Sequence, residues 1–313
     1  MKRIFVFLCL VLFSLSSSAD VARFNEGYQL IRAKQYKEAI AVLTPLAEQG
    51  HADAQYWLGL SYRVGRPDQD FSDLESELHW YREAAKNNQP YALWRLGKGQ
   101  YLSCQLFNAC EHKNEKYLDQ ARAIWRQRAA QGDGEAMYNI GIRDLGWKRW
   151  IPYYNAYARV EWMKKAIEHG YPRAVGELYY VLRDLGGENN QKEILTWLRI
   201  AAEKGDPWAQ TRLGSVAESP EERLSWIQKA AAQNYSEGLF ALGFNYRYGE
   251  DIEKDLNKAT FYYCILSYNS TARMACSNLF KELPKQKQEK VSVQVKEWLE
   301  HNTVYYFTDP LFD

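Results

Sequence analysis

The residues of this chain best suited to acid–base catalysis or metal binding are its five histidines, and they form no known catalytic pattern. They are dispersed along the sequence, at His51, His79, His112, His169 and His301. We expect each to be a solvated or capping residue rather than a catalyst. A glycine-rich phosphate loop, a nucleophile elbow, a paired-histidine zinc helix and a dinucleotide fingerprint are all missing from the sequence. We therefore predict a protein that is not an enzyme and uses no cofactor.

Four of the five cysteines follow the N-terminal segment and fall into two local pairs, Cys104 with Cys110 and Cys264 with Cys276. Four cysteines allow three pairings, and the sequential one needs only local geometry, so we predict these two disulfides. The alternative for the first pair is a metal site with the acidic residue and histidine that follow it. Its spacing fits no familiar zinc arrangement, and we expect no metal.

The N-terminus reads as a secretory signal peptide. A basic start at Lys2 and Arg3 precedes an apolar stretch from Ile4 to Leu15, and small residues lead to a predicted cleavage after Ala19. The stretch is short for a membrane span, and a retained anchor is the alternative. The pattern looks bacterial and predicts a periplasmic protein with no membrane span after cleavage.

The charge balance argues against a nucleic-acid partner. The whole chain carries 40 basic and 39 acidic residues. Removal of Lys2 and Arg3 with the leader leaves 38 basic residues against 39 acidic ones, a formal charge of −1. Such a chain has no global basic field to attract nucleic acid.

The dominant pattern of the sequence is a set of residues that recurs at fixed offsets from a Trp. Copies that begin at Trp80, Trp197 and Trp226 share Ala at +4, Gly or Asn at +8, Ala or Gly at +12 and Leu-Gly at +16 and +17. Related copies begin at Val42, at Trp125 (shortened by one residue), at Trp162 and, in degenerate form, at Tyr262. A period of about 35 residues indicates a repeat solenoid.

Each copy predicts a helix hairpin. The Trp and the Ala at +4 share one face of a first helix, which ends at the Gly or Asn in a left-handed conformation. A second helix begins near the next Ala, after a residue such as Pro90, Pro172 or Pro207. We expect the Trp to be buried between successive hairpins, which stack as a quasi-one-dimensional array.

The string from Trp80 to Gly97 resembles the Sel1-like repeat, a relative of the tetratricopeptide repeat. The resemblance covers residues 22–280 and implies an all-α, right-handed α-solenoid of about seven hairpins. We assign residues 1–19 to the signal peptide, 20–282 to the solenoid and 283–313 to a capping helix with an aromatic tail. Val291, Val295, Trp298 and Leu299 form the apolar stripe of that helix. We expect the tail to fold back onto the solenoid or to contact a partner, in an extended conformation around Pro310.

Two surfaces are candidates for partner binding. The second and third residues after each Trp face away from the core, and they form a mainly cationic set that we name the first-helix stripe: Arg82, Arg128, Lys164, Lys165, Arg199 and Lys229. In the family that the sequence resembles, first helices tend to line the concave side, which implies a basic groove for an acidic partner. The alternative is an ordinary solvated face.

The second candidate is an aromatic segment with Trp147, Trp150, Tyr153, Tyr154 and Tyr157. These residue types dominate interface hot spots, although they can instead pack an irregular connection onto its neighbour.

These features predict a non-catalytic, periplasmic, protein-binding solenoid that is a monomer without its partner. The sharper hypothesis, which follows from the resemblance, is an immunity protein that binds and neutralises an envelope-directed toxin such as a secreted lipase. The alternatives are an envelope scaffold in polysaccharide export, motility or signalling, and an enzyme that hydrolyses a cell-wall component.

We predict two intramolecular disulfides and no free thiol in the exported protein, because its four cysteines form two local pairs in an oxidising compartment. Peptide mapping without reduction measures the pairing. A bond from Cys104 to Cys264 or Cys276, or a free thiol at full occupancy, would contradict it.

Overall fold

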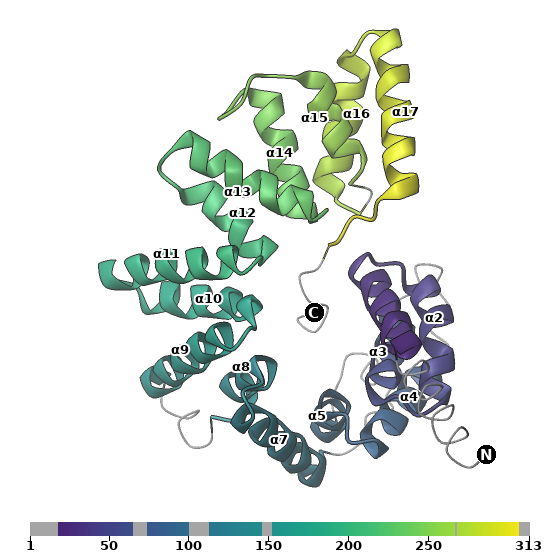
Figure 1. The fold of residues 1–313 in the computed structure, drawn as a ribbon, viewed down its shortest axis with the longest axis vertical. Coiled ribbons are helices and arrows are strands. Elements are labelled where there is room, and N and C mark those ends of the chain that lie inside the picture. Colours follow the sequence, from purple (N-terminus) through teal and green to yellow (C-terminus); the bar gives the residue numbers. More distant parts are fainter. Residues whose placement is uncertain (1–17, 65–73, 100–112, 146–151, 267, 307–313) are drawn as a thin grey trace, which may run out of the picture. The chain divides into compact units, whose positions relative to one another are not determined.

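The computed structural model describes residues 18–64, 74–99, 113–145, 152–266 and 268–306 (Figure 1). Within these ranges the chain is helical apart from short connections and one isolated β-bridge, as the all-α prediction requires. None of the helices described is both long and apolar enough to cross a membrane. The chain divides between Gln127 and Arg128 into two compact units, and each is described by itself.

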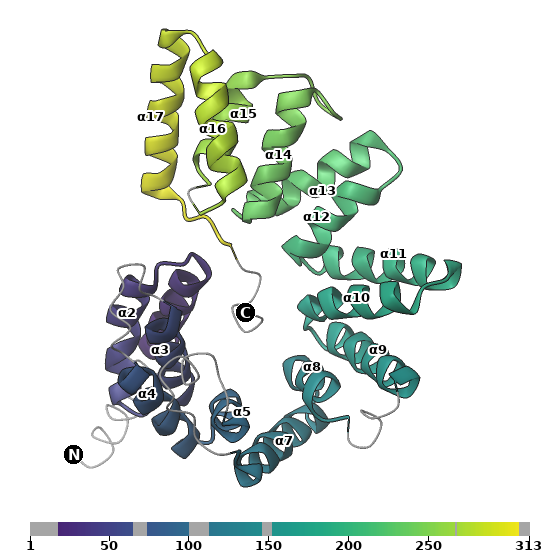
Figure 2. The same ribbon diagram turned by 180° about the vertical axis from the view of Figure 1, so that it is seen from behind.

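The helices follow one another as hairpins in both units (Figures 1 and 2). The first unit contains a helix over residues 18–32, α2 (Tyr36–Glu48), α3 (Ala52–Val64), α4 (Leu74–Lys86), α5 (Pro90–Lys98) and most of α7 (Glu115–Ala130). The second unit contains α8 (Gly134–Arg143), α9 (Pro152–Glu168), the 3₁₀ turn η2 (Pro172–Ala174), α10 (Val175–Leu185), α11 (Glu188–Glu203), α12 (Pro207–Val216), α13 (Pro220–Ala232), α14 (Ser236–Tyr248), α15 (Leu256–Cys264), α16 (Ser270–Glu282) and α17 (Lys285–His301).

The turn inside each hairpin forms as the sequence predicts. The Gly or Asn that ends each first helix has a positive φ, between 56° and 93°, at Gly50, Asn88, Gly132, Gly170, Gly205 and Asn234. At the end of α11, the amide of Gly205 donates to the carbonyl of Ala202 and the amide of Asp206 to that of Ala201, each over 3.0 Å. These two bonds satisfy terminal carbonyls, so the left-handed residue both ends the first helix and sets the start of the second.

Side chains cap the second helices. The Asp206 carboxylate accepts a hydrogen bond from the Ala209 amide over 2.8 Å at the start of α12, and Gln89 and Asp133 cap α5 and α8 in the same way. Such a cap satisfies one of the amides that a helix start leaves without a partner. The prolines at the start of α5, η2 and α12 occupy the first helical positions, as expected.

The expectation that the Trp of each copy is buried is wrong for three hairpins. Trp80, Trp162 and Trp197 are only half-buried. The residue after each Trp, at what we name the core position, is almost completely buried: Tyr81, Met163, Leu198 and Ile227. At 100° per residue, the buried positions +1, +4 and +5 centre about 90° from the Trp, which therefore lies at the edge of the buried face.

Two Trp residues are buried for separate reasons. Because the copy at Trp125 is one residue short, this ring occupies the core position, and it is 1% exposed. Trp226 stands at the regular Trp position but is covered, since Lys229 lies over its ring at 3.8 Å and its indole nitrogen donates to Glu222 over 3.3 Å.

Successive hairpins are joined where a core-position side chain packs against a glycine of the preceding second helix. A Cβ atom built on Gly59 of α3 would lie 2.8 Å from the ring of Tyr81, which is fully buried in α4. In the second unit, Gly214 of α12 receives Ile227 of α13 in the same way. Any side chain at these glycines would push the next hairpin away.

Buried glutamines add a polar connection between hairpins. Gln210 of α12 donates to the Ala202 carbonyl over 3.0 Å, and its side-chain oxygen accepts from Gln233 of α13 over 2.9 Å. Gln55 of α3 makes the equivalent bonds to Ala47 and Asn87. We name each set an amide clamp, because one buried side chain holds three helices in register.

The last hairpin contains the predicted disulfide between Cys264 of α15 and Cys276 of α16, with the two Cα atoms 5.0 Å apart. Closing a loop of this length contributes about 3 kcal/mol in the chain-entropy account. Cys104 and Cys110 lie outside the described residues. The capping helix α17 packs on α15, where Trp298 meets Phe261 edge-on at 6.4 Å, and Val291 is its buried residue.

The chain after α17 folds back onto the solenoid, as predicted. Tyr305 forms a parallel bridge with Tyr235, the residue between α13 and α14. Its amide donates to the Asn234 carbonyl and its carbonyl accepts from the Ser236 amide, both over 2.9 Å. Val304 is buried, and the ring of Tyr306 packs against Tyr268. The segment around Pro310 lies outside the described residues.

We predict that Leu198→Ala lowers the free energy of unfolding by about 2–5 kcal/mol, because it empties a core position. Trp197→Ala should cost less despite its greater volume, because this ring is half-exposed. Urea unfolding of the two variants gives the comparison. The exposed Leu195, on the same helix, supplies a control in which the same Leu-to-Ala change should be nearly neutral. A larger loss for Trp197→Ala would contradict the assignment of the core position.

Gln210→Ala should lower the free energy of unfolding by about 1–3 kcal/mol, since it removes the two hydrogen bonds of a buried side chain, to the Ala202 carbonyl and from the Gln233 amide. Gln228→Ala is the control, because Gln228 is exposed on α13. Equal stability of the two variants in thermal or urea unfolding would refute the amide clamp.

Candidate protein-binding surfaces

The first-helix stripe lies at the surface, as its offsets predict. Arg82, Arg128, Lys165, Arg199 and Lys229 are exposed, and Lys164 is half-buried. Arg82 belongs to the first unit and the other five residues to the second. The stripe is therefore not described as one surface across the chain, and its role in partner binding stays a prediction.

Acidic side chains of neighbouring first helices balance part of this stripe. Lys164 of α9 pairs with Glu193 of α11 at 2.5 Å and with Glu161 at 3.3 Å, and Arg199 of α11 pairs with Glu222 of α13 at 3.0 Å. Partial burial lowers the pKa of Lys164, but the bonds to Glu193 and Glu161 outweigh it and raise the pKa above its ordinary value. The pairs with Glu193 and Glu222 join hairpins that follow one another.

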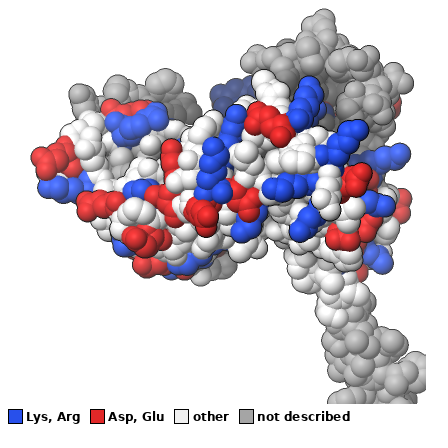
Figure 3. Space-filling model, turned by 90° about the horizontal axis from the view of Figure 1, so that it is seen from above, with Lys and Arg blue, Asp and Glu red and all other residues white. Residues whose placement is uncertain are grey.

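Two further lysines of the stripe lie over the Trp of their own helix. The Lys165 ammonium is 5.0 Å from the centre of the Trp162 ring, and Lys229 is 3.8 Å from that of Trp226. The spacing of three residues places each cation above the ring face, where the quadrupole attracts it. The stripe is thus partly satisfied within the protein, and the space-filling view in Figure 3 shows basic and acidic residues interspersed on the visible face.

The aromatic segment is only partly described. Trp147 and Trp150 lie outside the described residues, and Tyr153 lies in the first turn of α9. Tyr154 and Tyr157, also on α9, are each 59% exposed. Their exposure agrees with a contact surface, but nothing tests this function.

A third surface, which the sequence analysis missed, runs over the second helices of the second unit. Its residues follow the Trp position by 11, 15, 18 or 22, a spacing that places them on one helix face. We name it the second-helix face: Tyr180 on α10, Trp208 and Arg212 on α12, and Phe244 and Tyr248 on α14. Tyr180, Phe244 and Tyr248 are 43%, 38% and 53% exposed.

The rings of this face and the Arg212 guanidinium contact one another in a tilted arrangement. The Trp208 ring lies 6.3 Å from Tyr180, and the Arg212 guanidinium lies 5.1 Å from the Trp208 ring. Phe244 and Tyr248 are 4.6 Å apart. These contacts restrict the side-chain rotamers, which lowers the conformational entropy that binding of a partner would cost.

The second helices also approach one another closely. α10 packs against α12 and α12 against α14, whereas α9, α11 and α13 are further apart in the described residues. Helices on the inner side of a curved stack lie closest together. In the second unit the second helices therefore lie closer together than the first helices. The first-helix groove implied by the resemblance stays a prediction.

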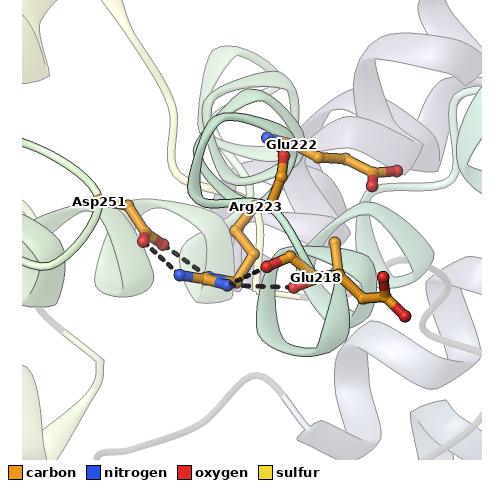
Figure 4. Close-up of polar contacts among 6 residues, drawn as sticks. Glu218, Glu222, Arg223 and Asp251 are labelled. Atoms are coloured by element: carbon orange, nitrogen blue, oxygen red, sulfur yellow. Dashed lines mark hydrogen bonds and ion pairs between the residues drawn. The ribbon is translucent and has the colours of Figure 1, made fainter.

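Arg223 fixes the hairpin that carries Phe244 and Tyr248 (Figure 4). Its guanidinium donates to both oxygens of Asp251, over 2.8 and 2.5 Å, and to the carbonyls of Ala217 and Glu218 over 3.2 and 3.0 Å. Bidentate pairing of this kind fixes orientation as well as distance. One side chain thus ties the connection before α13 to the connection after α14.

The histidines of the described chain serve mainly as local hydrogen-bonding groups. The His51 ring accepts from the Ala54 amide over 3.2 Å, and the rings of His169 and His301 contact backbone carbonyls of their own helices. These contacts are of the capping kind that the sequence indicates. His112 lies outside the described residues. No metal-binding group of three or more His, Cys, Asp or Glu occurs in the described part of the chain.

Comparison with known proteins gives curated relatives and solved structures. An uncharacterised protein of Neisseria meningitidis serogroup B is 30% identical over 251 residues, which are 77% of this chain and 49% of the relative. The chain thus spans about half the length of that relative. A Sel1 repeat protein from Oxalobacter formigenes has a TM-score of 0.45 at 22% identity, over 80% of this chain and 99% of that one. An immunity protein of Pseudomonas aeruginosa has a TM-score of 0.42 at 16% identity, over 80% and 81%.

A family model, the Sel1 repeat, matches five segments of the chain: residues 52–89, 160–171, 174–206, 209–235 and 236–267. The matched segments contain the left-handed turns at Asn88, Gly170, Gly205 and Asn234 and the glycines Gly59 and Gly214, which receive core-position side chains. The chain therefore belongs to the Sel1 repeat family, whose hairpins form a protein-interaction fold.

Proposed function

We propose that this protein binds another folded protein through the second-helix face and that it performs no catalysis itself. The observation that carries the proposal is a row of exposed Tyr and Phe rings, together with the half-buried Trp208 and Arg212, on three consecutive second helices. Aromatic rings and Arg supply most of the binding energy at protein interfaces. Several cations of the first-helix stripe, by contrast, already contact acidic or aromatic side chains within the protein.

The rigidity of the supporting hairpins favours a stoichiometric complex. The amide clamp at Gln210 holds α12 against α11 and α13, and Arg223 holds the ends of the α13–α14 hairpin. A surface that is ordered before binding loses little conformational entropy when the partner arrives. Such preorganisation suits tight and specific binding of one folded protein.

We further propose that the partner is an envelope-directed toxin, such as a secreted lipase, which this protein neutralises in the periplasm. Two features support this compartment: the leader-like N-terminus and the disulfide between Cys264 and Cys276, a bond that persists in oxidising environments. Inhibition requires only that a large surface cover the partner's active site. An envelope scaffold is the alternative, and its partner would stay active in the complex.

The test compares variants in affinity purification from periplasm, followed by calorimetry with the recovered partner. The triple variant Tyr180→Ala, Phe244→Ala, Tyr248→Ala removes exposed rings of the second-helix face. We expect its affinity to fall at least tenfold, because one lost hot spot costs about 2 kcal/mol. Circular dichroism and urea unfolding should remain close to those of the parent protein.

Two control proteins make the result specific. Leu195→Ala removes an exposed apolar side chain from α11 and should bind normally. The charge reversal Arg82→Glu, Lys165→Glu, Lys229→Glu tests the first-helix stripe. Loss of binding in the charge reversal, with unchanged binding in the ring variant, would refute the assignment of the second-helix face. For inhibition, activity of the recovered partner should fall in proportion to added protein, and full activity at a one-to-one ratio would reject neutralisation in favour of the scaffold.

A further inference from the structure

The capping helix leaves an apolar groove on the last hairpin. In the second unit, each second helix from α8 to α14 packs against the helix that follows it. Within the second unit α16 differs, because α17 packs on α15. Between α16 and α17 lies a groove of about 750 Å³, whose lining includes Phe280, Val291, Val295, Leu299 and the Cys264–Cys276 disulfide.

The groove corresponds to the seat that other second helices offer to the next hairpin. Asn269 caps α16 as Asp206 caps α12, so the two helices can be aligned from their caps. This alignment places Ser277 of α16 at the position of Gly214 in α12. Gly214 receives the core-position side chain of α13, whereas Ser277 lines the groove. The groove is therefore the place where a following first helix would insert its core residue.

We propose that this groove binds an amphipathic α-helix of a partner protein, with a bulky apolar residue over Ser277 and acidic residues beside Lys281 and Lys296. Continuity with the stacking interface of the second unit defines the helical shape of the occupant, since four second helices bind a helix at this face. The charged residues of the groove are Lys281, Lys296 and Glu300. Glu300 lies 3.9 Å from Lys296, and the remaining net charge of +1 favours an acidic helix. This surface is separate from the second-helix face, and the proposal does not rest on the proposed function.

The probe is a peptide of this chain's own α13, residues 220–232, which fills the equivalent seat on α12. It carries Glu221 and Glu222 in its first turn, Ile227 at its core position and Trp226 beside it. A hydrocarbon staple between positions 228 and 232, both exposed in α13, keeps the peptide helical and lowers the cost of ordering. Fluorescence anisotropy of the labelled peptide measures binding to the purified protein.

We expect saturable binding that weakens at least tenfold for Ser277→Trp, which fills the seat, and for Leu299→Glu, which places an acidic group in the groove. Val293→Glu is the matched control, because Val293 is 54% exposed on α17 and lies outside the groove lining. It should bind the peptide as the parent protein does. Circular dichroism of all three variants verifies that the helices are retained.

A peptide with Ile227→Asp should not bind, because it lacks the apolar residue that enters the seat. Absence of saturable binding by the parent peptide, or equal binding by the Ile227→Asp peptide, would overturn the proposal. Equal losses for Val293→Glu and Leu299→Glu would do so as well. Sedimentation velocity provides the last test: self-association that Ser277→Trp abolishes would identify the occupant as a second copy of this chain instead.

Discussion

The close contact between one glycine and one large side chain determines how these hairpins stack. Gly59 and Gly214 have no Cβ atom at the point where Tyr81 and Ile227 approach, so the next first helix can lie almost against the backbone. Dense packing of this kind gains dispersion energy and excludes water. The remaining features of the array follow from this distance, including the amide clamp at Gln210, which can reach Gln233 only because the hairpins are so close.

The turns of the hairpins can be predicted from the sequence, whereas the buried face of each first helix is harder to predict. Turn chemistry is local, so the left-handed Gly205 and the capping Asp206 are readable from the chain alone. The exact direction of a helix face is less certain, because an error of one position rotates it by 100°. The Trp is the largest residue of the repeated pattern, yet the smaller residue after it, such as Leu198, is the one that is buried.

The binding surfaces were harder to predict because their chemistry depends on residues distant in sequence. The positive charge of Lys164 is visible in the local sequence, but its ion-pair partner Glu193 belongs to the next hairpin. The second-helix face was visible in principle, since Trp208, Phe244 and Tyr248 follow the repeat offsets. An isolated aromatic residue on a second helix nevertheless looks like ordinary core, and only the exposure of Phe244 and Tyr248 separates the two roles.

The bridge between Tyr305 and Tyr235 changes the mechanics of the C-terminal end. In an array with contacts only between neighbours, the terminal hairpin frays first, independently of hairpins further in. Here the chain passes over the last hairpin and hydrogen-bonds to the turn of the preceding one. The end is thereby closed into a loop, so α15, α16 and α17 cannot peel away without first breaking bonds at the α13–α14 turn. A pulling force on the C-terminus would therefore have to break the bonds at the α13–α14 turn before the terminal helices could separate one after another.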